Sequence, residues 1–227
     1  MRTQRLKLDR AAQSAIPNYD RLLLILLICS VQMLYFPTSN QMMGGIEPKL
    51  PIDVFPIIPI WVVPYVLCYP LWLFGIFWAT FKMDDDLFRS FIAALLLVST
   101  FSIATFVFFP TYIKASSFAG QDVFTNLLRS IHENWGRYDA FPSGHVYITT
   151  VLALFYSRWY PAHKPWWISS VVIVALSTLF TGQHYFVDIL GGLAVAFLGY
   201  YSGLKWAGIS TIRTRSRERD VIHPPAQ

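Results

Sequence analysis

Six apolar runs, separated by short polar or proline-containing segments, most constrain what this chain can fold into. They extend over residues 21–36, 54–81, 87–109, 142–160, 166–181 and 184–204. A helix needs roughly 20 mostly apolar residues to cross a bilayer, and most of these runs approach that length. Because 55% of the residues are hydrophobic and only 14% are charged, a soluble domain is a poor explanation. The sequence therefore predicts an all-α integral membrane protein, a bundle of six helices.

This membrane domain, residues 21–206, is expected to have a polar segment at each end. Residues 1–20 are predicted to be a cytoplasmic N-terminal segment, and residues 207–227 a basic, disordered cytoplasmic tail. Residues 111–140 are predicted to form an outer loop with a short helix around residues 123–132. No cleavable signal peptide is expected, because the first apolar run follows a charged stretch and lacks a small-residue cleavage site.

The basic residues predict the orientation of the bundle. With both termini in the cytoplasm, only Lys49, Lys114, Arg129 and Arg137 of the 18 lysine and arginine residues would face the other side. This bias follows the positive-inside rule and accounts for the formal net charge of +5 without a nucleic-acid partner.

Two polar strings interrupt the apolar pattern, at residues 141–145 (FPSGH) and 183–188 (QHYFVD). Each places a histidine at the start of a predicted helix, and the expected topology opens both helices on the extracytoplasmic face. Ionisable groups are costly within a membrane and usually have a working role there. The two strings therefore predict a functional site at that face.

In the second string, His184 and Asp188 are four residues apart, a spacing that places both on one face of a helix. The carboxylate can accept a proton from one ring nitrogen, which leaves the other with a lone pair for attack. This pair therefore predicts a phosphohistidine intermediate on His184. A purely structural pair that links two helices explains the same spacing and stays an alternative.

In the first string, Pro142 is favoured in a first helical turn, whose free N–H groups bind anions. Gly144 would let a phosphate approach the backbone, and Ser143 would add a hydroxyl donor. His145 would then act as the general acid on the departing oxygen. The alternative is an ordinary helix start that happens to carry a histidine.

A phosphate group in such a site also needs cationic partners. Lys114 and Arg137, in the outer loop, are the candidates for phosphate binding, and Arg129 lies further away along the chain. Each could equally be a solvated loop charge.

Together these strings resemble the type 2 phosphatidic acid phosphatase superfamily. Residues 142–145 match its Pro-Ser-Gly-His motif, and Ser177, His184 and Asp188 match its next motif. The resemblance implies a six-helix core, His184 as nucleophile, Asp188 as its orienting carboxylate, His145 as acid and no required metal or cofactor. Thr178 stands where the family usually has arginine. Residues 51–201 look closest to the branch that includes inositol phosphorylceramide synthases.

The expected function is hydrolysis of a lipid-linked phosphate ester, with a lipid phosphate or phosphodiester and membrane lipids as partners. Transfer of a phosphoinositol or phospho-sugar headgroup to another hydroxyl is the enzymatic alternative. Two further readings stay open: a metal-dependent hydrolase that uses both histidines and Asp188, and a lipid-binding or carrier protein without activity.

Overall fold

The computed structural model describes residues 18–41, 44–114, 118–134 and 138–209. This part of the chain is helical, which confirms the all-α prediction. Its α-helices are α2 (Asn18–Met33), α3 (Tyr35–Gln41), α4 (Val62–Lys82), α5 (Asp85–Phe108), α6 (Val123–Asn134), α7 (Gly144–Trp159), α8 (Lys164–Phe180) and α9 (Phe186–Trp206). Two short 3₁₀ helices, η1 (Pro59–Trp61) and η2 (Pro161–His163), precede α4 and α8.

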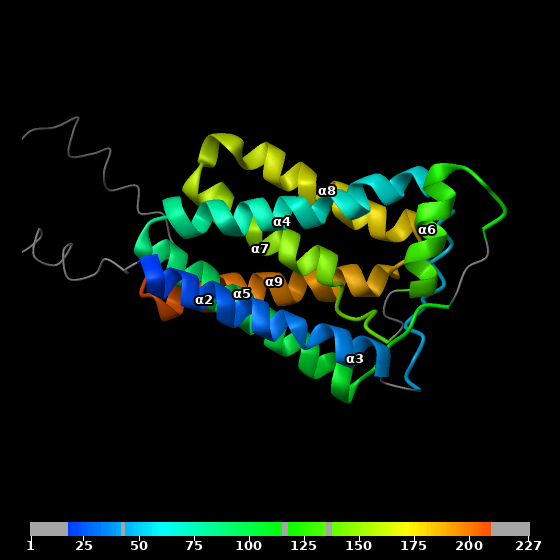
Figure 1. Cartoon of the computed structure of the whole chain (residues 1–227), viewed down its shortest axis with the longest axis horizontal. Coiled ribbons are helices and arrows are strands. Elements are labelled where there is room, and N and C mark those ends of the chain that lie inside the picture. Colours follow the sequence, from blue (N-terminus) through cyan, green and yellow to red (C-terminus); the bar gives the residue numbers. More distant parts are fainter. Residues whose placement is uncertain (1–17, 42–43, 115–117, 135–137, 210–227) are drawn as a thin grey trace, which may run out of the picture.

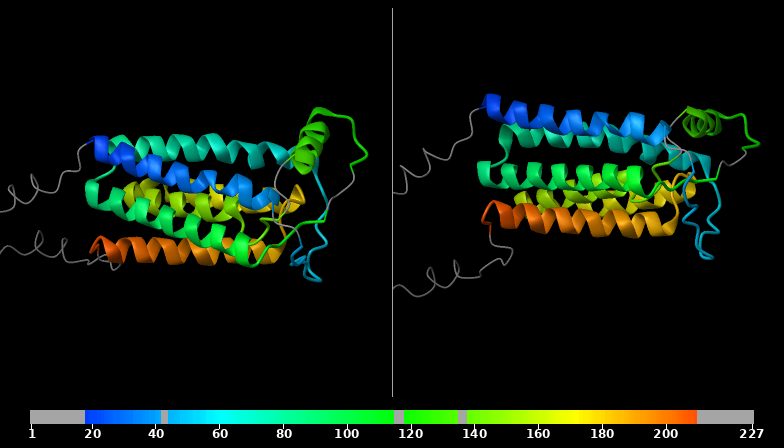
Figure 2. Two further views of the ribbon diagram at one scale, coloured as in Figure 1. Left: turned by 60° about the horizontal axis from the view of Figure 1, so that its bottom comes forward. Right: turned by 90° about the horizontal axis from the view of Figure 1, so that it is seen from below.

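The long helices run side by side, and α6 lies across one end of the bundle (Figures 1 and 2). The helix predicted within the outer loop is thus confirmed as α6. Helix α7 lies in the interior, with most of its first three turns buried. Helices α5 and α9 pack closely because small residues lie at their contact. A Cβ at Gly203 would lie only 2.4 Å from the carbonyl oxygen of Ser90, so a larger residue would force the helices apart.

The prediction of six membrane spans is not confirmed as a count. Among the described residues, four helical segments are long and apolar enough to cross a membrane: Tyr19–Ser39, Pro59–Lys82, Asp85–Phe108 and Phe186–Trp206. Helices α7 and α8 have 16 and 17 residues. Both are shorter than the roughly 20 residues that a helix needs to cross a bilayer.

Two turns correct the predicted helix starts. Helix α7 begins at Gly144 and not at Pro142, because Ser143 is extended and serves as its N-cap. Helix α9 begins at Phe186, so His184 lies in the turn before the helix. Gly182, with a φ of 66°, ends α8 in the left-handed conformation that glycine favours and turns the chain toward His184.

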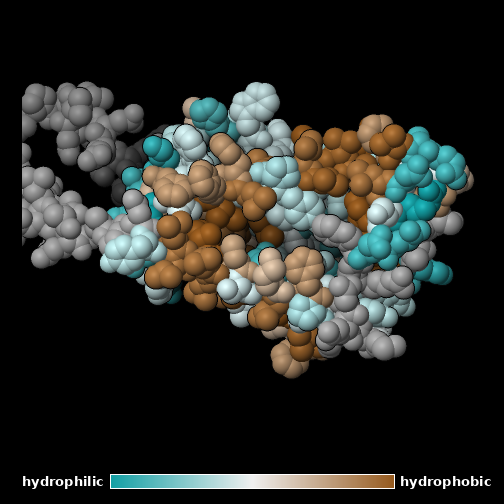
Figure 3. Space-filling model, in the orientation of Figure 1, coloured by the Kyte–Doolittle hydropathy of each residue, from teal (hydrophilic) through white to brown (hydrophobic). Residues whose placement is uncertain are grey.

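Apolar side chains cover much of the length of the bundle, while hydrophilic residues gather over α6 (Figure 3). At the opposite end, the buried Arg21 donates to the carbonyls of Thr80 (2.8 Å) and Met83 (2.9 Å) and also pairs with Asp85. Arg21 therefore satisfies carbonyls at the end of α4 and joins α2 to the turn before α5. The chain's two ends beyond residues 18 and 209, including the basic tail, lie outside the described residues.

Candidate active site

The two predicted histidines meet at the end of the bundle that α6 covers. Their ring centroids are 5.9 Å apart, with 63° between the ring planes. His145 comes from the first turn of α7, and His184 from the turn between α8 and α9. Segments about forty residues apart in sequence thus bring two imidazoles to one place.

A glycine pair in α9 allows this approach. A Cβ at Gly191 would lie 2.2 Å from the ring of Phe141, and one at Gly192 would lie 2.9 Å from the carbonyl oxygen of Ser143. The Ser143 N–H also donates to the carbonyl of Asp188 at 3.1 Å. The turn before α7 therefore packs directly on the backbone of α9. Sequence reasoning missed this pair, although adjacent glycines in an apolar helix signal close packing.

His184 is held at Nδ1 by two oxygen atoms. The carbonyl oxygen of Ala140 lies 2.9 Å away, and Oδ2 of Asp188 lies 3.5 Å away. A carbonyl can only accept, so Nδ1 carries the hydrogen and Nε2 keeps its lone pair. Asp188 is fully buried, and its Oδ2 also accepts the N–H of Tyr185 at 2.8 Å. The structure thus adds a carbonyl to the carboxylate that the sequence indicated.

His145 is surrounded by aromatic side chains of α4. Its ring stacks on Tyr65 with centroids 4.1 Å apart, and the rings of Tyr69 and Trp72 lie 5.5 and 5.6 Å away. Thr149 anchors the backbone here, because its hydroxyl accepts from the Trp72 indole and donates to the His145 carbonyl. The spacing of these aromatics, four and seven residues along α4, could have revealed this face from the sequence.

Three buried polar atoms of this site have no hydrogen-bond partner among the described residues: Nε2 of His145, Oγ of Ser143 and Oδ1 of Asp188. Unpaired buried polar atoms are rare in folded proteins and call for an explanation. A ligand oxygen bound between the two histidines could pair with Nε2 of His145 and with Oγ of Ser143, whereas Oδ1 of Asp188 is a carboxylate oxygen and needs a donor.

The candidates for phosphate binding differ in position. Gly144 lines the cavity described below, and a Cβ there would meet nothing closer than 3.8 Å, so the fold leaves its backbone open to approach. Lys114 is exposed and also lines the site. Arg137 lies outside the described residues. Arg129 donates to the carbonyls of Phe118 and Gly120, so it holds its own loop in place.

A second carboxyl group, which sequence reasoning missed, lies beside His184. Asp139 accepts a hydrogen bond from the Tyr35 hydroxyl of α3, and its backbone pairs with Thr111. Burial raises the pKa of Asp139, against the opposing effects of the Tyr35 hydrogen bond and of His184. Asp139 therefore connects α3 to the loop before α7. The carbonyl of the next residue in this loop, Ala140, holds His184, the candidate nucleophile.

His132 holds helix α6 against the site, because its Nε2 lies 2.9 Å from the carbonyl oxygen of Thr181. Burial lowers the pKa of His132, which favours the neutral ring that donates one hydrogen bond here. The sequence pointed to no role for this residue.

Two hollows meet at His184. A cavity of about 650 Å³, here called the aromatic cavity, extends along α4 past Tyr65, Tyr69, Trp72 and Ile76. At about 1.5 Å per residue these side chains span about 16 Å, close to half of a hydrocarbon core of about 30 Å. The aromatic cavity is thus about as deep as one leaflet.

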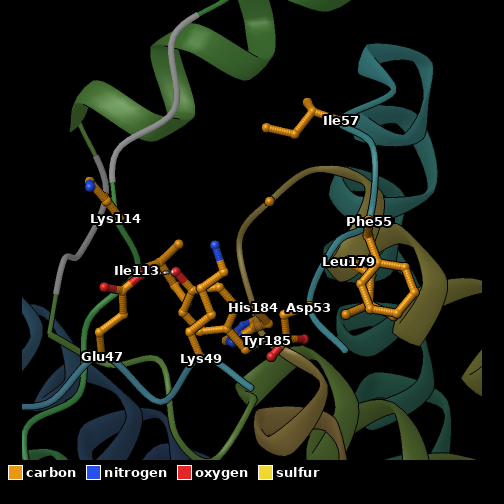
Figure 4. Close-up of a pocket in the computed structure, with 11 residues that line it drawn as sticks. Glu47, Lys49, Asp53, Phe55, Ile57, Ile113, Lys114, Leu179, His184 and Tyr185 are labelled. Atoms are coloured by element: carbon orange, nitrogen blue, oxygen red, sulfur yellow. Dashed lines mark hydrogen bonds between the residues drawn. The ribbon is translucent and has the colours of Figure 1, made fainter. Parts of the chain in front are cut away.

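The second hollow, here called the outer pocket, has a volume of about 210 Å³. Its polar lining includes Glu47, Lys49, Lys114 and Tyr185, and Figure 4 shows these around His184. Residues Ile113, Lys114, Gly182 and His184 line both hollows, so His184 stands between a mainly apolar space and a polar one.

Among the described residues, no group of three or more His, Cys, Asp or Glu side chains could hold a metal ion. Metal independence therefore stays a prediction, since the resemblance alone suggested it.

Residues 57–202 match the PAP2 superfamily, a range that contains both histidine strings. The chain belongs to this family. Membership confirms the resemblance seen in the sequence and, with four apolar helices, identifies a multi-pass membrane protein of a lipid phosphatase and phosphotransferase family.

A stretch of 61 residues is 36% identical to the inositol phosphorylceramide synthase catalytic subunit of Saccharomyces cerevisiae. The stretch covers 27% of this chain and only 15% of the yeast protein. The similarity agrees with the branch suggested by the sequence.

Proposed function

We propose that this protein hydrolyses a lipid-linked phosphate ester through a phosphohistidine formed on His184. One observation carries the proposal: the ring of His184, whose Nδ1 is tethered and whose Nε2 has no hydrogen-bond partner among the described residues, lies 5.9 Å, centroid to centroid, from a second imidazole. Both rings line the aromatic cavity. A lipid tail would occupy that cavity while its phosphate lies between the histidines.

In the first step, Nε2 of His184 attacks phosphorus, and the bond between phosphorus and the lipid oxygen breaks. Protonated His145 gives its proton to that oxygen, so that the lipid leaves as an alcohol. The positive charge that develops on His184 is stabilised by Asp188 and by the Ala140 carbonyl.

In the second step, water attacks the phosphorus of the phosphohistidine, and the bond between phosphorus and nitrogen breaks. His145, now neutral, accepts a proton from this water and returns to its starting state. Inorganic phosphate leaves, so atoms and charge balance over the cycle.

The phosphate oxygens would be held by groups at the start of α7. The free N–H groups of that first turn, the backbone at Gly144 and the unpaired hydroxyl of Ser143 offer donors. Lys114 would supply a positive charge from the opposite side, and Arg137 is proposed as a second cation.

Headgroup transfer is the alternative reaction, favoured by the polar outer pocket beside the nucleophile and by the similarity to the yeast synthase. In that case a hydroxyl of another molecule replaces water in the second step. A lipid-binding or carrier protein without activity is the non-enzymatic alternative.

We further propose that α7 and α8 cross the membrane with the four longer segments, with both termini in the cytoplasm. The start of α2 and the end of α9 lie at the same end of the bundle, opposite α6 (Figure 1). The active site would then open on the extracytoplasmic or lumenal face. Reporter fusions at each terminus test this arrangement, and a reporter active only outside the cytoplasm would contradict it.

The function is tested with purified full-length protein in detergent and a panel of lipid phosphates and phosphodiesters. We expect phosphate release from at least one lipid, unaffected by a chelator. Release from none would favour the carrier, and chelator-sensitive activity that zinc restores would favour a metal-dependent hydrolase.

A further inference from the structure

The hydrogen bond between the Tyr35 hydroxyl and the carboxyl group of Asp139 has no part in the proposed reaction. It joins α3, which precedes the range that matches the family, to the loop before α7. We propose that Tyr35 and Asp139 are positioning residues that make the reactivity of His184 depend on a lipid tail in the aromatic cavity. This inference rests on the proposed function and extends it to the choice between tailed and tailless phosphate esters.

The loop that carries Asp139 is built around the carbonyl that tethers the nucleophile. The N–H of Ala140 donates to the Thr111 carbonyl (3.1 Å), and the N–H of Phe141 donates to the Thr111 hydroxyl (2.7 Å). The carbonyl of Ala140 lies 2.9 Å from Nδ1 of His184. Asp139 is thus the residue next to this carbonyl, and a displacement of Asp139 would displace the tether of His184.

Asp139 also acts on His184 through its charge. Burial raises the pKa of Asp139, whereas the Tyr35 hydrogen bond and the neighbouring His184 lower it. The interaction is mutual, so a negative charge on Asp139 favours the positive charge that develops on His184 during attack. The Tyr35 hydroxyl stabilises that negative charge by donating to it. Loss of the hydroxyl would therefore affect both the position and the charge of Asp139.

At the other end of this hydrogen bond, Tyr35 forms part of the wall of the aromatic cavity. Its ring packs edge-on against Phe106 of α5, with centroids 6.2 Å apart and 74° between the planes. Asp139 and both histidines line the same cavity. Neighbours of Tyr35 in α2 and α3 line it as well: Ile28, Cys29, Gln32, Met33 and Phe36. A lipid tail in the cavity would thus contact the segment that carries Tyr35, while its phosphate lies beside His184.

Helix α2 is packed less tightly than α4 and α5, which line the same cavity. Among residues 19–33 of α2, only Arg21 and Ile28 have buried side chains, whereas α4 buries seven residues and α5 eleven. Arg21 joins the start of α2 to the turn before α5, and the bond from Tyr35 to Asp139 joins the following helix to the active-site loop. A tail that fills the cavity would add contacts along α2 and so hold Tyr35 in place.

This arrangement predicts an effect of the tail on the rate of the chemical step. Binding energy from a remote part of a substrate can be used to align the reacting groups, and it then appears in kcat. Here the tail would hold α2 and Tyr35, and Tyr35 would hold Asp139, so that the Ala140 carbonyl stays aligned on His184. A phosphate ester without a tail would lack these contacts and react with a lower kcat.

The test compares two probes with the purified full-length protein, dioctanoyl phosphatidate and glycerol 3-phosphate, which are both phosphate esters of glycerol. We expect the wild-type kcat to be higher with phosphatidate by about tenfold or more. Tyr35→Phe and Asp139→Asn should each lower kcat with phosphatidate about tenfold, the effect of one hydrogen bond to a charged group, and change kcat with glycerol 3-phosphate little. The double variant should lose little more than Asp139→Asn alone, because Tyr35 acts through Asp139.

Tyr201→Phe and Asp84→Asn, at exposed positions outside both hollows, are the matched controls and should keep wild-type rates. Unfolding temperatures in the same detergent detect a folding defect, and Tyr35→Phe, which removes a single oxygen atom, is the milder change.

Equal losses with both probes would show that the two residues are purely structural and would overturn the coupling. A loss confined to KM, or a wild-type kcat that is the same for both probes, would also overturn it, and lipid hydrolysis by His184 would stand. A wild-type protein that releases phosphate from neither probe would overturn the coupling together with the hydrolysis on which it rests.

Discussion

The starts of α7 and α9 each carry one histidine, yet they hold it in opposite ways. At α9, the carbonyl of Ala140 and the carboxylate of Asp188 tether Nδ1 of His184. At α7, the ring of His145 is positioned by stacking on Tyr65, while its Nε2 has no partner among the described residues. A tether on one nitrogen prepares the other for attack, and an unpaired nitrogen is suited to exchange a proton with a ligand. The difference supports the proposed roles, His184 as nucleophile and His145 as proton donor.

The largest effect is expected from removing the tethered ring. His184→Ala should abolish lipid turnover, because it removes the proposed nucleophile. His163→Ala, an exposed histidine in η2, is the matched control and should keep wild-type activity. Turnover by purified protein and insertion in membrane fractions are the two measurements. Wild-type turnover by the His184 variant would contradict the proposal that His184 is the nucleophile.

His145→Asn should lower kcat by about 10² to 10⁴, the usual contribution of a general acid or base. The loss should shrink with a p-nitrophenyl phosphate ester, whose leaving group needs no proton. We would measure single-turnover rates for phosphoenzyme formation with both substrates. Equal losses would show that His145 positions the substrate and does not donate a proton.

Asp188→Asn distinguishes the two tethers of His184. Where a carboxylate alone sets the histidine tautomer, the corresponding change costs about 10⁴ in kcat. Here the Ala140 carbonyl is closer to Nδ1, so the tautomer should persist, and we expect a loss of about 10- to 100-fold. Steady-state kcat is the measurement, with thermal unfolding as the check on folding. A loss near 10⁴ would mean that the carbonyl contributes little.

The smallest effects should come from the glycines that bring the two regions together. Gly191→Ala places a methyl group 2.2 Å from the Phe141 ring and should destabilise the protein by about 1–3 kcal/mol. Gly144→Ala meets nothing within 3.8 Å and should leave thermal stability unchanged. Unfolding temperatures in one detergent compare the pair. Similar temperatures for both variants would contradict the packing between α9 and the turn before α7.

The sequence predicted the helical architecture well, because apolar runs and their polar breaks report directly on membrane helices. It misplaced helix ends at Pro142 and His184, where N-capping geometry decides the start. The count of six spans is not confirmed, because α7 and α8, with 16 and 17 residues, are shorter than the roughly 20 residues that cross a bilayer.

The candidate site was partly predictable. His145, His184 and Asp188 carry recognisable spacing, and the structure brings them together. The Ala140 carbonyl could not be foreseen, because any residue has a carbonyl and only the path of the chain aims it. The positions of Glu47 and Lys49 could not be predicted either, because they depend on the hydrogen bond by which Asp53 joins their loop to the start of α9.

The most direct test is to trap the phosphoenzyme. A lipid substrate labelled on phosphorus, quenched during turnover in alkali to preserve phosphohistidine, should leave the label on the peptide that contains His184. The bond should be labile to acid. Label on His145, on another residue or on none under single-turnover conditions would contradict the account of two histidines with separate roles.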